Sequence, residues 1–208
     1  KGNILDPIEI IKQYGLDPLR YYLIKEVSFG NDGNISQERL EDCINSDLAN
    51  NFGNLCQRVS TFAIKNCESK IPKKIEFQTE DLEILNEYTK NLNNLRTEID
   101  NQNINYYIEY VINRLFEANK YFNDQEPWKK KDDKIRLNTI VFTSLEIIRK
   151  ITFLLYPVIP QSCLKVLNIF NLKEKDIIFK TIGDNDFLKK GSSINKIDIL
   201  FNKIEREK

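Results

Sequence analysis

Three polar side chains recur at every fourth residue in one segment of the chain, and they are the first candidates for chemistry. Asn50, Asn54 and Arg58 stand at this spacing, which places them in one row along a helix; we call them the polar row. Amide and guanidinium groups carry the donors and acceptors that read nucleobase edges. The polar row therefore predicts binding of a flat polar group, and the alternative is a helix face that is only solvated.

The second candidate is Trp128, the only tryptophan of the chain, which follows Pro127 and precedes Lys129, Lys130 and Lys131. An indole held at a rigid corner can stack on an unpaired base, with lysines close to phosphates. The alternative is a tryptophan of the core or of a hinge, beside a solvated lysine run. If the chain forms an up-and-down bundle, Trp128 and the polar row can meet at one end of it.

Composition sets bounds on the class of protein. The chain has 208 residues, of which 41% are hydrophobic and 30% charged, and its formal net charge is zero. This profile is typical of a soluble globular protein with one large or two small domains. Any nucleic-acid binding must then rest on a local patch. The sequence has no apolar run long enough for a bilayer and no signal peptide, so we expect no membrane association.

The residue types also restrict the chemistry. There is no histidine, and the four cysteines form no Cys-x-x-Cys pair, which argues against a zinc site, a secreted disulfide framework and histidine-activated nucleophiles. We expect no metal, and reduced, mostly buried thiols in the cytoplasm. Because the chain begins with Lys1 and contains no methionine, we interpret it as a piece of a longer protein.

Helices are the elements that must position the candidate residues. Five apolar side chains recur at steps of four and three, which predicts a helix over 46–66 with an inward stripe made of Leu48, Phe52, Leu55, Val59 and Phe62. The polar row then points outward. The same periodicity predicts further helices over 80–101 (with Thr79 as its cap), 104–122, 136–155 and 160–170. The helix over 136–155 is apolar on most sides, so we expect it at the centre of the bundle.

The chain ahead of residue 46 shows shorter helices and turns. Asp6 and Pro7 start a helix that Gly15 ends, Asp17 and Pro18 start another, and Ser36 caps a third. The segment from Phe29 to Ile35 reads as a loop. We therefore predict an all-α fold with a connecting segment over 1–45, a helix bundle over 46–172 and a tail over 173–208 that packs back on the bundle.

Several blocks of sequence in this order resemble one family. Tyr14-Gly-Leu-Asp-Pro-Leu-Arg, with Lys1 to Pro7 before it, is similar to the segment that follows the ATP-binding signature loop of class I aminoacyl-tRNA synthetases. The stretch from Asn45 to Arg58, Glu126-Pro-Trp128 and Tyr156-Pro-Val-Ile-Pro160 resemble methionyl-tRNA synthetase more specifically. The resemblance covers residues 1–172, and the tail matches more loosely.

The resemblance implies roles for the candidate residues. In that family, the residues matching Asn54 and Arg58 hydrogen-bond the anticodon, chiefly its first base, a cytosine, and the residue matching Trp128 stacks on that base. Those matching Asn50 and Pro127 lie in the same site. Lys129, Lys130 and Lys131 are weaker candidates for phosphate contacts. The segment 1–45 matches the small fold that joins the catalytic domain to the bundle and touches the inner side of the tRNA.

The resemblance also implies a parent enzyme. That enzyme uses ATP and Mg²⁺ to attach methionine to its tRNA, and its catalytic domain would lie ahead of Lys1. We therefore expect no catalytic residue and no cofactor in this chain, which should be inactive alone. The expected partner is the anticodon loop of the methionine-accepting tRNA, and we expect a monomeric, cytoplasmic protein.

Two alternatives remain open at this point. Another class I synthetase, such as the enzyme for cysteine, valine or leucine, would share the bundle and the opening block but would not need Asn54, Arg58 and Trp128 together. A helical protein-interaction module would need an exposed apolar groove instead of a polar row beside an indole.

Overall fold

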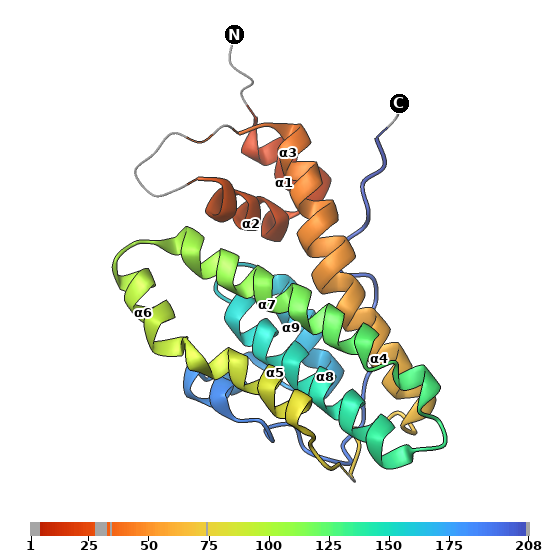
Figure 1. Cartoon of the computed structure of the whole chain (residues 1–208). Coiled ribbons are helices and arrows are strands. Elements are labelled where there is room, and N and C mark those ends of the chain that lie inside the picture. The colour runs from red at the N-terminus through yellow and green to blue at the C-terminus, as the bar shows by residue number, and fades with distance from the viewer. Residues whose placement is uncertain (1–4, 28–32, 34, 74, 207–208) are drawn as a thin grey trace.

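Helices make up most of the part of the chain that the structure describes, up to Gly183. The computed structural model describes residues 5–27, 33, 35–73 and 75–206, and over these ranges it contains helices, turns and one isolated bridge between Lys70 and Ser193. The predicted all-α fold is confirmed (Figure 1). The first four residues of the opening block and most of the expected loop from Phe29 to Ile35 lie outside the described residues.

Three short helices form the N-terminal part. They are α1 (Pro7–Tyr14), α2 (Leu16–Glu26) and α3 (Gln37–Cys43). Two predicted start signals are confirmed: Asp6 accepts a hydrogen bond from the Ile8 amide, and Ser36 accepts one from the Arg39 amide. The start predicted at Asp17 and Pro18 is displaced, because α2 begins at Leu16 and no side chain caps it. Gly15 separates α1 from α2 with a φ of 94°, a conformation that a residue without a Cβ adopts easily.

One long helix carries the polar row. Helix α3 continues through a π-helical segment (Ile44–Gly53) into α4 (Asn54–Asn66) without leaving helical backbone geometry. In the π-helical segment each backbone hydrogen bond spans five residues instead of four. The Asn54 amide, for example, donates to the carbonyl of Ala49. The helix predicted over 46–66 is confirmed, but it starts earlier and contains wide turns that the sequence pattern did not predict. Because this helix crosses residue 45, the domain division at that point remains a prediction.

A buried carboxylate ties the N-terminal helices to this long helix. Asp47 accepts hydrogen bonds from the hydroxyl of Tyr21 at 2.8 Å and from the ammonium of Lys25 at 2.6 Å. Burial and the neighbouring Asp47 raise the pKa of Tyr21, so its hydroxyl keeps its proton and remains a donor. This network fixes α2 against the π-helical segment.

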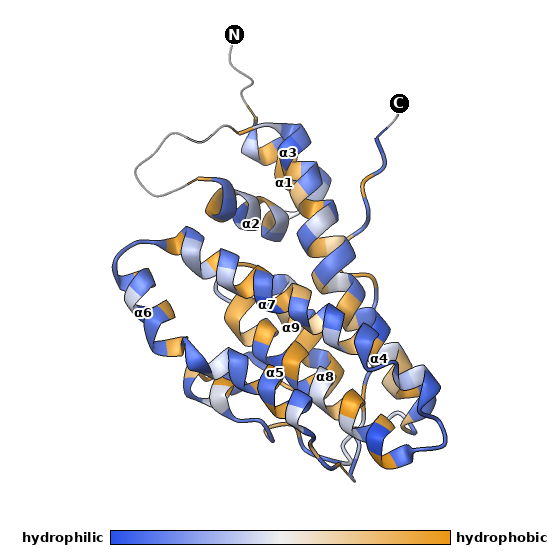
Figure 2. Cartoon of the chain, viewed as in Figure 1, coloured by the Kyte–Doolittle hydropathy of each residue, from blue (hydrophilic) through white to orange (hydrophobic). Residues whose placement is uncertain are grey.

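The remaining helices are α5 (Thr79–Lys90), α6 (Leu92–Asp100), α7 (Ile104–Asp124), α8 (Lys134–Leu155) and α9 (Pro160–Leu167). Helices α5, α7 and α9 pack on α8, and α6 packs on α7 and α5. Helix α8 is buried on nearly every side from Arg136 to Leu155, which confirms its predicted central place. Figure 2 shows the same arrangement by hydropathy, with apolar residues gathered where α8 meets its neighbours and polar residues outside.

The single helix predicted over 80–101 is wrong in two respects. Asn91 leaves helical geometry with φ −115° and ψ 9°, so α5 and α6 are separate helices. The break falls in a run containing Asn91, Asn93 and Asn94, whose side chains compete with the backbone for hydrogen bonds. The cap of α5 is Gln78 and not Thr79, and the Asp81 carboxylate accepts the Gln78 amide at 2.8 Å.

Buried charges on α8 hold the tail in place. Arg149 donates to the backbone oxygens of Thr181 at 3.0 Å and of Asp184 at 2.7 Å. Glu146 accepts the Leu188 amide at 2.5 Å. A buried charge is tolerated only when it is paired and hydrogen-bonded, and the tail supplies these partners. Through these contacts, tail residues 181–188 lie against α8.

All four cysteines are free, as expected, and Cys43, Cys56 and Cys163 are buried, whereas Cys67 is half-buried. Burial raises the pKa of the Cys43 thiol to about 12 and that of Cys67 to about 11. Because the thiolate is the reactive form, we expect the folded protein to react with a thiol reagent at pH 7.5 roughly a hundredfold or more slowly than an unfolded peptide thiol.

This expectation is checked by following the reaction of the protein with an aromatic disulfide, with and without denaturant. All four thiols should react quickly in denaturant, and Cys67 should react first in the folded protein. A fast reaction of three or four thiols without denaturant would contradict the buried core described here.

Candidate nucleic-acid interface

The turn between α7 and α8 forms a rigid corner that presents Trp128. Glu126 adopts a left-handed conformation with φ 44°, and a short 3₁₀ turn covers Pro127–Lys129. Pro127 is buried, and Asp133 caps α8 by accepting the Arg136 amide at 3.0 Å. The indole of Trp128 remains 39% exposed. The sequence expectation of a tryptophan held at a corner is therefore met by the geometry.

A buried ion pair lies beneath this corner. The guanidinium of Arg136 donates to both carboxylate oxygens of Asp81, at 2.5 and 3.1 Å, and to the side-chain oxygen of Gln125 at 2.5 Å. The hydroxyl of Tyr121 donates to the same carboxylate. Asp81 is fully buried. These contacts join α5, the end of α7 and the start of α8, and they fix the backbone that carries Trp128.

Arg58 and Trp128 meet on one aromatic ring. The ring of Phe122 makes an edge contact with Trp128, with centroids 6.1 Å apart, and the guanidinium carbon of Arg58 lies 5.6 Å from the Phe122 centroid. Arg58 also donates to the side-chain oxygen of Asn123 at 2.7 Å. The structure therefore brings these two predicted residues together, although they are 70 positions apart in the sequence.

The two side chains border a shallow surface hollow of about 410 Å³, which we call the indole hollow. Its lining consists of Gln57, Arg58, Thr61, Phe62, Lys65, Phe122 and Trp128. An aromatic ring, a guanidinium and side-chain amide and hydroxyl groups thus face one space. This set suits a flat ring that carries hydrogen-bonding edges, such as an unpaired nucleobase.

Asn50 and Asn54 lie beside the indole hollow and not in it. Both are exposed, and they line a second hollow of about 320 Å³ between the long helix and the tail residues 199–203. We call this space the tail hollow. Gln57 borders both hollows, so they adjoin. The polar row is therefore divided, with Arg58 at the indole and the two asparagines at the tail.

The three lysines that follow Trp128 are placed less favourably. Lys129 forms an ion pair with Glu126 at 2.7 Å, and Lys130 and Lys131 are exposed. None of the three lines the indole hollow or the tail hollow. A role for them in phosphate binding therefore remains a prediction without geometric support.

Sequence reasoning missed three residues of the indole hollow that share one spacing. Gln57, Thr61 and Lys65 recur every fourth residue, in the row next to the polar row. The four-residue periodicity would have predicted them as well if the row next to the polar row had been considered. Phe122 was expected to face inward and is buried, yet it also forms the floor of the hollow, which no local pattern indicates.

Comparisons with known proteins agree with this geometry. The family model described as the anticodon binding domain of methionyl tRNA ligase matches residues 71–208, and the model for tRNA synthetases class I (M) matches residues 1–60. The methionine–tRNA ligase of Brucella suis biovar 1 (strain 1330) is 40% identical over 169 residues, which are 81% of this chain and 33% of that protein. That of Rickettsia felis (strain ATCC VR-1525 / URRWXCal2) is 36% identical over 208 residues, which are 98% of this chain and 41% of that protein.

Solved structures of methionyl-tRNA synthetase are similar to this chain as well. The apo form of Mycobacterium tuberculosis methionyl-tRNA synthetase superposes with a TM-score of 0.90 at 30% identity, and the match covers 98% of this chain and 42% of that one. The same enzyme in complex with methionyl-adenylate gives a TM-score of 0.90 at 32% identity, covering 97% of this chain and 40% of that one. The chain thus spans about a third to two fifths of the relatives it matches.

The helix bundle and the two family models define this chain as part of a class I aminoacyl-tRNA synthetase. The full set of matches identifies one member of this class, and both alternatives from the sequence, another class I enzyme and an interaction module, give way to it. The chain belongs to the methionyl-tRNA synthetase family.

The ion pair beneath the corner generates a stability prediction. Asp81→Asn should lower the free energy of unfolding by roughly 3–5 kcal/mol, because it leaves the buried Arg136 charge uncompensated. Urea titration followed by circular dichroism measures this loss, and the emission maximum of Trp128 reports on the corner itself.

A matched control breaks an ion pair at the surface. Lys120 pairs with Asp124 on exposed α7 positions, so Lys120→Ala should change the free energy of unfolding by about 1 kcal/mol or less. If Asp81→Asn costs no more than this control, the ion pair does not hold the corner.

Proposed function

We propose that this chain recognises the anticodon loop of the methionine-accepting tRNA on behalf of a methionyl-tRNA synthetase. The observation that carries the proposal is the shared indole hollow, in which Arg58 and Trp128 face one space. Family membership supports it, because the matched family model is described as an anticodon binding domain.

The physical basis of recognition follows from the residues in the hollow. Bases of a single-stranded loop can be splayed out and stacked on an aromatic ring. Arg58 carries N–H donors only, which suit the O2 and N3 acceptors of cytosine. Its bond to Asn123 and its contact with Phe122 hold the guanidinium in place before RNA arrives. We infer that the first anticodon base, a cytosine, stacks on Trp128 and is read by Arg58.

Asn50, Asn54 and Pro127 have separate roles in this proposal. The two asparagines offer both a donor and an acceptor in the tail hollow, next to the stacked base. Pro127 is buried and fixes the turn that presents the indole. Lys129, Lys130 and Lys131 make at most loose phosphate contacts, since Lys129 already pairs with Glu126.

The activity of the whole protein is part of the same proposal. We infer that it attaches methionine to its tRNA at the expense of ATP with Mg²⁺, in the cytoplasm, and that this part is monomeric. Segment 1–45 joins the catalytic domain to the bundle.

Over the described residues no group of three or more His, Cys, Asp or Glu side chains is arranged to hold a metal ion, so no step is assigned to Mg²⁺ here. Within the same residues, each helix is too short or too polar to span a bilayer.

The stacking role is tested with Trp128→Ala. Binding of a fluorescent anticodon stem-loop with the methionine anticodon should weaken by roughly 1–3 kcal/mol, about 5- to 150-fold in Kd, because the stacking surface is lost. Fluorescence anisotropy measures Kd. The control is Phe116→Ala, which removes an aromatic ring that is 55% exposed on α7 and lines neither hollow. Equal affinities for the two variants would rule out stacking on Trp128.

Base readout is tested with Asn54→Ala. Wild-type protein should bind a stem-loop with cytosine as the first anticodon base more tightly than one with uridine. The variant should discriminate several-fold less, because it has lost the Asn54 side-chain amide next to the stacked base. Asn93→Ala, on exposed α6, serves as the control. Unchanged discrimination in the Asn54 variant would show that this amide does not read the base.

A further inference from the structure

The tail hollow pairs the two asparagines of the long helix with the end of the chain. Asn50, Asn54 and Gln57 form one wall, and residues 199–203 form the other. Any group that hydrogen-bonds both asparagines must therefore lie against the tail. Two exposed polar side chains, those of Asn202 and Lys203, are the ones that the tail contributes to this wall.

A glycine on the long helix lets the tail approach. A Cβ atom on Gly53 would lie 3.6 Å from the ring of Phe201 and 3.1 Å from the carbonyl oxygen of Leu48. Any larger side chain would push the tail away from the helix. Phe201 itself is buried, so it anchors the tail on the long helix beside Gly53 and leaves its polar neighbours at the surface.

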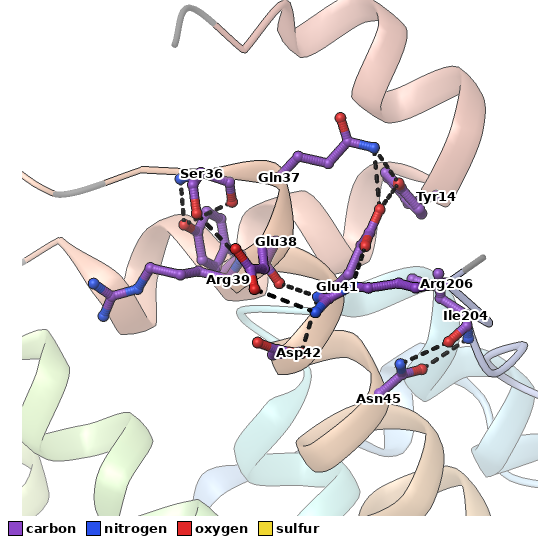
Figure 3. Close-up of polar contacts among 11 residues, drawn as sticks. Tyr14, Ser36, Gln37, Glu38, Arg39, Glu41, Asp42, Asn45, Ile204 and Arg206 are labelled. Carbon is purple, nitrogen blue, oxygen red and sulfur yellow. Dashed lines mark hydrogen bonds and ion pairs between the residues drawn. The ribbon is translucent and has the colours of Figure 1, made fainter. Parts of the chain in front are cut away.

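The tail is also fixed beyond the hollow. The side chain of Asn45 exchanges two hydrogen bonds with the backbone of Ile204, at 2.9 and 2.8 Å. Arg206 pairs with Glu41 at 2.7 Å and with Asp42 at 2.9 Å, and Figure 3 shows its side chain reaching among the acidic residues of α3. Because it is held on both sides of Lys203, the tail is a preorganised wall and not a loose end.

We propose that residues Ile199–Lys203 form the second wall of the RNA site. Asn202 presents its amide to a base edge in the tail hollow, and Lys203 binds a backbone phosphate of the same single-stranded loop. The site then extends from the indole hollow across Gln57 to the tail and takes two neighbouring nucleotides. This inference rests on the proposed function and adds residues that follow the bundle in sequence.

The salt dependence of binding tests the role of Lys203. For single strands, the logarithm of the binding constant falls with the logarithm of salt concentration by about 0.7 per neutralised phosphate. Lys203→Ala should weaken binding of the same anticodon stem-loop several-fold at low salt and reduce this slope by about 0.7. Lys196→Ala, an exposed lysine of the same tail that lines neither hollow, is the matched control and should leave both quantities unchanged.

A second measurement does not depend on affinity. Ile199 is 63% exposed at the edge of the tail hollow, so a photo-crosslinking amino acid placed there should attach to a loop nucleotide beside the first anticodon base. The same amino acid at Ile178, which is 51% exposed and lines neither hollow, should not. A crosslink at position 199 and a lowered slope support the tail wall.

The outcomes separate this inference from the proposed function. If Trp128→Ala weakens binding while Lys203→Ala behaves like Lys196→Ala and position 199 gives no crosslink, the tail wall is wrong and anticodon recognition stands. If neither Trp128→Ala nor Lys203→Ala changes binding, the proposed function and the tail wall both fail. Thermal unfolding of each variant by circular dichroism shows that the fold is retained.

Discussion

The ion pair between Asp81 and Arg136 is the constraint on which the RNA-facing end of the molecule depends. Both groups are buried, so each must keep the other, together with Tyr121 and Gln125, as a partner. A buried charge accepts few geometries, because a displaced partner leaves it uncompensated. The pair therefore links three helices and fixes the turn from which Trp128 projects. The ion pair matters here because it allows one arrangement of these helices, more than because of the net stability it adds.

The π-helical segment lets one helix serve two packing partners. Its wider turns rotate the faces of its own residues and of those ahead of it relative to the faces of α4. On one side Asp47 faces Tyr21 and Lys25, whereas α4 packs on the central helix α8. The N-terminal helices are further held by Asp17, which accepts the Ser162 amide at 2.6 Å. The connecting segment and the bundle thus share one backbone with two differently oriented faces.

Local sequence patterns predicted the features that depend on interactions within one helix, and tertiary packing determined the other features. The apolar stripe from Leu48 to Val59 and the buried α8 follow from helical periodicity, and both were predicted. Phe62, predicted in the same stripe, is only half-buried and lines the indole hollow. The helix break at Asn91 depends on small differences in helix propensity among weak helix formers. The spacing of apolar residues carries no information on such differences. The division of the polar row between two hollows depends on a tail that is about 150 residues away in the sequence. No window along α4 contains that information.

The pairing of Asn45 with Ile204 has a consequence for the order in which the chain acquires its parts. The two residues are 159 positions apart, so their contact can form only after the whole bundle between them has been synthesised. Bundles form from nearby contacts as synthesis proceeds, at roughly 5–20 residues per second, so the turn that presents Trp128 is complete before the tail is available. A nascent chain therefore carries the stacking surface first. It gains the tail hollow only after residue 203 has left the ribosome and the tail packs against the long helix.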